Sequence, residues 1–150
     1  MDAKRAMALY KVEKLMEETR HLAVAYRRST GQTLAVSGEI ARYDGLRLLH
    51  IKPVNDLQGV DGILDYQGQS IRVQIKGRVI FDESKNIYKL GKINLDTPWQ
   101  MMLLVLLNAD YETDSIYGLT RELIEANEGR QKPFSVAKFK AIGTLLWSRP

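Results

Sequence analysis

Apolar residues recur along the first part of the chain at the spacing of an α-helix. The stripe is formed by Ala8, Val12, Leu15, Met16, Thr19, Leu22, Ala23 and Tyr26. Steps of three and four residues place these positions on one side of a helix, so the pattern predicts a long amphipathic helix over residues 3–28. The polar segment 29–32, which contains Gly31, is expected to end it.

A second helix and a hairpin follow. Ser37 is of the residue type that caps a helix N-terminus, which predicts a helix over residues 38–49 that Pro53 prevents from continuing. Residues 60–65 and 71–79 then show the apolar alternation of strands. The dipeptide Gln67-Gly68 between them predicts a tight two-residue turn.

The second half of the chain contains three further apolar segments. Residues 87–93 and 115–119 are predicted to be strands, and the continuous apolar run 101–108 predicts a central strand buried on both faces. Thr120 and Ser135 are expected to cap two short helices, which end near Asn127 and Gly143. The order predicts an α+β fold, a mixed central sheet flanked by helices, in one domain over residues 1–150.

The turn at Gln67-Gly68 fixes an expected register for the hairpin. If the loop has two residues, Asp61 lies opposite Gln74 and Ile63 lies opposite Arg72, with their side chains on the same face. Lys76 belongs to that face as well, together with Asp65. The opposite face is expected to be wholly apolar. It would contain Val60, Gly62, Leu64, Ile71, Val73 and Ile75.

Polar groups on this hairpin could hold a metal ion. Asp61 offers a carboxylate, Gln74 an amide oxygen and Ile75 a backbone carbonyl, which are the oxygen ligands that Mg²⁺ prefers. Lys76 is placed to orient or deprotonate an attacking water and to stabilise developing negative charge. Alternating polar residues are also typical of a plain solvent-exposed strand face, so the pattern alone leaves both interpretations open.

Composition excludes several kinds of site. The chain has no cysteine, which rules out disulfides, thiolate metal sites and cysteine nucleophiles within it. The longest apolar run is far too short to cross a bilayer and no secretory signal is evident, so a soluble, cytoplasmic protein without a membrane partner is expected. The net charge of +4 is compatible with a polyanionic partner.

The segments Gly59-Val60-Asp61-Gly62-Ile63 and Val73-Gln74-Ile75-Lys76-Gly77, preceded by Ser37-Gly38-Glu39, resemble the PD-(D/E)xK nuclease superfamily. The similarity is greatest to the restriction-endonuclease-like branch that writes its core motif as QxK. It implies a restriction-endonuclease-like core, with Glu39, Asp61, Gln74 and Lys76 as catalytic residues. It also implies Mg²⁺, for which Mn²⁺ could substitute, held by Glu39, Asp61, Gln74 and Ile75.

The resemblance implies a magnesium-dependent endonuclease that hydrolyses phosphodiester bonds, with DNA as the expected substrate. A chain of this length leaves little room for a recognition domain, so a homodimer or a partner specificity protein is expected to supply specificity. Gln74 stands where the family has an acidic ligand, which favours as an alternative an inactive nuclease fold that binds nucleic acid or a protein. A plain α+β interaction domain with an accidental motif is a third interpretation.

Overall fold

The computed structural model describes residues 3–85, 87–127 and 134–150, with side chains described from residue 11 onward. Along these residues the elements are α1 (Ala3–Thr30), α2 (Ser37–Leu48), β1 (Lys52–Pro53), β2 (Gly62–Tyr66), β3 (Gln69–Val79), β4 (Met101–Leu107), β5 (Thr113–Thr120), α3 (Arg121–Asn127), α4 (Val136–Ile142) and β6 (Thr144–Ser148). The predicted α+β class is confirmed. None of the described helices is long and apolar enough to cross a membrane.

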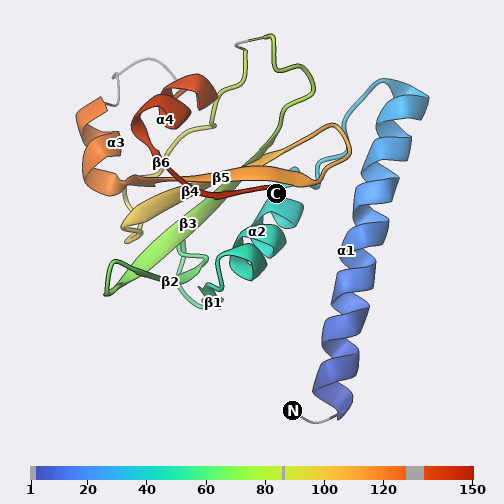
Figure 1. Ribbon diagram of the computed structural model, residues 1–150, viewed down its shortest axis with the longest axis horizontal. Coiled ribbons are helices and arrows are strands. Elements are labelled where there is room, and N and C mark those ends of the chain that lie inside the picture. Colours follow the sequence, from blue (N-terminus) through green and yellow to red (C-terminus); the bar gives the residue numbers. More distant parts are fainter. Residues whose placement is uncertain (1–2, 86, 128–133) are drawn as a thin grey trace.

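The six strands form one sheet in the order β1-β2-β3-β4-β5-β6. Neighbouring strands are antiparallel except β3 and β4, which run parallel. The helix α2 covers one face of the sheet, and α3 and α4 cover the other (Figure 1). The long helix α1 stands beside this layered body.

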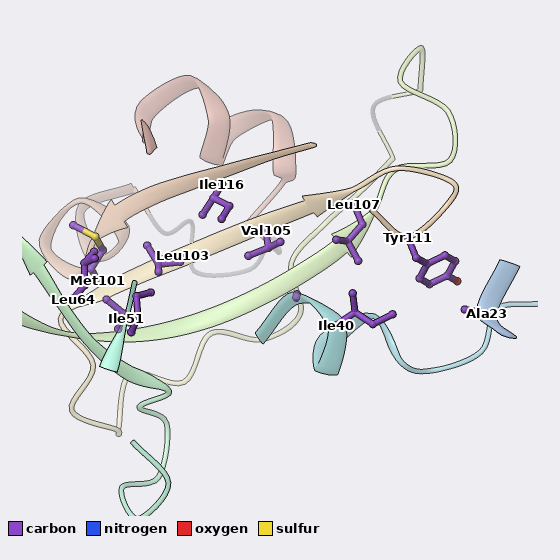
Figure 2. Packing of buried hydrophobic residues seen from close by; sticks show 12 residues of the cluster. Ala23, Ile40, Ile51, Leu64, Met101, Leu103, Val105, Leu107, Tyr111 and Ile116 are labelled. Atoms are coloured by element: carbon purple, nitrogen blue, oxygen red, sulfur yellow. The ribbon is translucent and has the colours of Figure 1, made fainter. Parts of the chain in front are cut away.

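The strand β4 lies in the middle of the sheet, and all seven of its residues are buried. This confirms the central strand predicted from the apolar run. Its side chains alternate between two hydrophobic clusters. Met101, Leu103, Val105 and Leu107 face the α2 side, where they share a cluster with Ile40 of α2 and Ala23 of α1 (Figure 2). The even-numbered residues face α3 and α4.

The hairpin of β2 and β3 has the predicted register. Ile63 pairs with Arg72, Asp65 with Ser70, and Tyr66 with Gln69. Gln67 and Gly68 both have positive φ, 51° and 78°, which is the geometry of the type I′ turn that two-residue hairpins prefer. The apolar side chains behave as expected with one exception. Val60 precedes β2 and packs into the cluster on the α3 and α4 side instead.

Other expectations were wrong. Residues 87–93 form no strand. Lys89 makes one isolated bridge to Ser135, and the apolar side chains of Leu90 and Ile93 are buried in the core. Ser37 is the first residue of α2 rather than its cap, and the capping position, Val36, makes no side-chain hydrogen bond. The short strands β1 and β6 were not predicted, because neither has a distinctive apolar alternation and both form only by pairing at an edge.

The apolar stripe of α1 is mostly exposed, although an apolar stripe normally marks the buried side of a helix. The helix itself is confirmed, but Val12, Leu15, Leu22 and Tyr26 remain exposed, and Ala23 is its only fully buried described residue. A charged contact ties the helix to the body. Arg20 forms an ion pair with the buried carboxylate of Asp44 in α2.

The helix α2 approaches β3 closely because glycines and an alanine form the contact. A Cβ atom on Gly77 would lie 2.3 Å from the Cβ of Ala41 and 3.0 Å from the carbonyl oxygen of Ser37. On the helix side, a Cβ on Gly45 would lie 3.2 Å from Ile75. Small residues at these positions therefore set the distance between α2 and the strand that carries Gln74 and Lys76.

Replacing Gly77 with alanine is expected to destabilise the protein by about 2 kcal/mol, because α2 must shift away from β3 to relieve the overlap. Urea denaturation measures the change. Gly38→Ala is the matched control, since a Cβ at this position in the first turn of α2 meets nothing within 4 Å. If Gly77→Ala were as stable as the control, the close contact between α2 and β3 would be wrong.

Candidate metal site at the end of the hairpin

Asp61 lies where the chain enters β2, directly beyond the last strand pair of the hairpin. Its backbone N–H donates to the carbonyl of Val73 at 2.8 Å, so Asp61 and Gly62 both lie against Val73, and the regular register ends there. Its carboxylate oxygen Oδ2 accepts a hydrogen bond from the N–H of Ile75 at 2.6 Å. Because Val73 and Ile75 flank Gln74, these two bonds hold Asp61 beside the segment of β3 that contains Gln74. The predicted pairing of Asp61 with Gln74 lies beyond the ladder, which ends at Gly62 and Val73.

Gln74 has an unsatisfied acceptor at this position. Its side-chain oxygen Oε1 is buried and has no hydrogen-bond partner among the described residues. A buried acceptor left without a partner costs on the order of 1–3 kcal/mol, so such atoms usually meet water or an ion. The amide oxygen of Gln74 is therefore suited to receive a cation.

The Ile75 carbonyl points toward the same edge. The N–H and C=O of one strand residue project to the same side, and the Ile75 N–H faces Asp61. The strand pairing with β2 has ended by this point. The carbonyl is thus directed to the place where the two chains separate.

Lys76 follows two residues after Gln74, on the same face of β3, beside Leu104 of β4. Burial lowers the pKa of its ammonium group, the nearby Arg78 lowers it further, and the Asp61 carboxylate acts in the opposite direction. Lys76 makes no ion pair within 4.0 Å in the part of the chain that the structure describes. Its charge is half-buried and is not neutralised by a direct partner.

Glu39 lies in the first turn of α2 and is exposed. Within the described ranges, no hydrogen bond or ion pair of its side chain is recorded. It precedes Arg42 by three residues, so the two side chains are neighbours on the same side of α2. Arg42 contacts Asp61. Asp61 therefore lies beside the segment of β3 that carries Gln74 and Lys76, and Glu39 lies one helical turn from Arg42, which contacts Asp61. Among the described residues, no hydrogen bond or ion pair joins Glu39 or Arg42 to Gln74 or Lys76.

Arg42 is a member of the site that sequence reasoning missed. Its Nε donates to Oδ1 of Asp61 at 3.0 Å, and its Nη2 donates to Oδ1 of Asn55 at 3.1 Å. The sequence offered one signal, the spacing of three residues between Glu39 and Arg42. Nothing in that spacing identifies Asp61 as the partner, because the contact depends on how α2 lies on the sheet.

No protein-family model matches the chain, and no curated protein matches it.

Proposed function

We propose that this protein is a metal-dependent endonuclease of the PD-(D/E)xK type that hydrolyses phosphodiester bonds in DNA, and that its core is restriction-endonuclease-like. One observation carries the proposal. A carboxylate, a half-buried ammonium group, and a buried amide oxygen that has no hydrogen-bond partner among the described residues lie on the segments where β2 separates from β3. Oxygen ligands of these kinds can hold a divalent cation, and an ammonium group can stabilise the charge that develops in phosphodiester hydrolysis.

The residues present fit a Mg²⁺ ion. Asp61 and Gln74 would provide side-chain oxygens, and Ile75 would provide its carbonyl. Glu39 would complete the set from α2. All are the hard oxygen ligands that Mg²⁺ takes, and Mn²⁺ accepts the same set. The unsatisfied oxygen of Gln74 supports this fit most directly, since a bound cation would give it the partner that it lacks.

When bound, a divalent cation polarises the phosphodiester and makes water a stronger nucleophile. The chain's own contribution comes from Lys76. Because its pKa is lowered, a larger fraction of Lys76 is in the neutral amine form at a given pH. The neutral amine can accept the proton of the attacking water as the new P–O bond forms. While protonated, it stabilises the negative charge that builds on the phosphoryl oxygens as the bond to the leaving oxygen breaks.

Incubation of the protein with supercoiled plasmid tests this function. Nicked or linear product is expected with Mg²⁺ or Mn²⁺ and none with EDTA. The catalytic-site variant Asp61→Asn, which keeps the size of the side chain and removes its charge, should give no product. Product formed equally with EDTA, or equally by Asp61→Asn, would contradict a metal site at Asp61.

A second candidate is a nuclease-like fold that binds nucleic acid without cutting it. Two observations favour it: the neutral amide at position 74, and the arginine that holds the Asp61 carboxylate. Binding of plasmid, single-stranded DNA or RNA without any cleavage, with Mg²⁺ and Mn²⁺ present, would select this candidate.

Changing Gln74 to glutamate is expected to tighten Mg²⁺ binding on the order of tenfold. The substitution adds a third negative charge to the two of Glu39 and Asp61, and unit charges at contact distance near a protein surface attract by a few kcal/mol before desolvation and mutual repulsion reduce the gain. Calorimetric titration measures the affinity, with Gln74→Ala expected to bind more weakly than wild type. Equal affinity in all three proteins would show that Gln74 is not a ligand.

A further inference from the structure

The guanidinium of Arg42 occupies a cation position next to Asp61. It forms the recorded ion pair of that carboxylate, with Nε 3.0 Å from Oδ1. The Arg42 side chain is 33% exposed and that of Asp61 is 24% exposed, so the pair is partly shielded from water. The same guanidinium also donates to Asn55 and, at 3.5 Å, to the carbonyl of Val54.

Both oxygens of the Asp61 carboxylate are therefore engaged. The Ile75 N–H takes Oδ2, and this bond holds the carboxylate in place against β3. A cation would bind at the other oxygen, Oδ1, which accepts a hydrogen bond from Nε of Arg42. A carboxylate has lone pairs for more than one partner, but a divalent ion and a guanidinium on the same oxygen repel each other strongly.

We propose that Arg42 and the divalent metal compete for Asp61, so that Arg42 fills the cation position of the metal-free site and is displaced when metal binds. This inference rests on the proposed function, because it requires Asp61 to be a metal ligand. Arg42 has other acceptors after displacement, since its bonds to Asn55 and Val54 do not involve the Asp61 carboxylate. The exchange therefore leaves its charge partly satisfied.

The direction in which metal affinity changes when Arg42 is removed distinguishes competition with the metal from a purely structural role. If Arg42 only holds Asp61 in the correct position, removing it must weaken metal binding. If Arg42 competes with the metal, removing it must strengthen metal binding. The charge that leaves the site is positive, so electrostatics favours the second result.

Titration with Mn²⁺ alone, followed by the electron paramagnetic resonance signal of the free ion, measures the affinity. Arg42→Gln is expected to bind Mn²⁺ about tenfold more tightly than wild type, a value below the full Coulomb attraction because the pair is partly exposed. Arg47→Gln is the matched control. It removes the same charge from the same helix, but Arg47 pairs with Asp44 at 3.7 Å, and its affinity should equal that of wild type.

Equal or weaker binding by Arg42→Gln, with clear binding by wild type, would overturn the competition and leave the proposed function intact. No binding by any of the three proteins at millimolar Mn²⁺ would overturn both. If Arg42→Gln does not fold, Arg42→Lys replaces it. Lysine lacks the fork that reaches Asp61 and Asn55 together, so it is a weaker competitor, and an affinity about threefold above wild type is expected.

Discussion

Cleavage of plasmid DNA is expected to fall by about a thousandfold or more when Lys76 is replaced by alanine. Under the proposed mechanism, the variant loses both the group that accepts the water proton and the positive charge that stabilises the transition state, and general acid–base catalysis alone contributes about 10²–10⁴-fold. Burial has lowered the pKa of this side chain, which suits it to a proton transfer that an exposed lysine performs poorly. The rate of plasmid nicking at saturating Mg²⁺ measures the loss.

The fold should survive this change, because no ion pair or hydrogen bond of the Lys76 side chain is recorded among the described residues. A circular dichroism spectrum and a melting temperature near those of wild type are therefore expected. Lys52→Ala is the control, since it removes the same charge from the exposed edge strand β1. It should cut at nearly the wild-type rate. A Lys76→Ala protein as active as this control would remove Lys76 from the mechanism.

The largest expected loss of stability follows from replacing Asp44 with alanine. Asp44 is 1% exposed and connects three elements: it pairs with Arg20 of α1, and its Oδ2 accepts a hydrogen bond from Thr113 of β5 at 2.6 Å. Without the carboxylate, Arg20 is left with an uncompensated and largely buried charge. Breaking a buried pair in this way costs about 3–5 kcal/mol.

Urea denaturation measures this cost, and limited proteolysis should show that α1 becomes accessible, because the pair of Arg20 with Asp44 is a largely buried charged contact between α1 and the body. Asp110→Ala is the matched control. Its contact with Arg28 is 4.0 Å long between side chains that are 78% and 62% exposed, so its loss should cost less than about 1 kcal/mol. If both variants were equally stable, α1 would be held by something other than the Asp44 contact.

The hairpin shows how far local chemistry alone determines structure. The turn residues Gln67 and Gly68 specify a two-residue loop, and the loop specifies every pairing between β2 and β3. This is why the pairing of Ile63 with Arg72 could be predicted, whereas the pairing predicted for Asp61 with Gln74 lies beyond the ladder. The central position of β4 could also be predicted, because a continuous apolar run is stable only when it is buried on both faces.

Edge elements could not be predicted in this way. The strands β1 and β6 exist because a partner strand offers them hydrogen bonds, and no local pattern in residues 52–53 or 144–148 indicates that partner. The apolar residues of segment 87–93 were misleading for the opposite reason. Leu90 and Ile93 are buried in the core and Ile87 is exposed, while the backbone forms one isolated bridge, between Lys89 and Ser135.

The sequence by itself determined the α+β class, the register of the hairpin and the shared face of Gln74 and Lys76 on β3, because these depend on turn geometry and on the two-residue period of a strand. Only the tertiary structure decided that Arg42 contacts the Asp61 carboxylate, that Asp44 pairs with Arg20 of α1, and that the oxygen of Gln74 is buried with no hydrogen-bond partner in the described part of the chain. The first two of these depend on the position of α2 against the sheet. That position is set by contacts between residues far apart in the chain, such as Gly77 with Ala41, which no local pattern encodes.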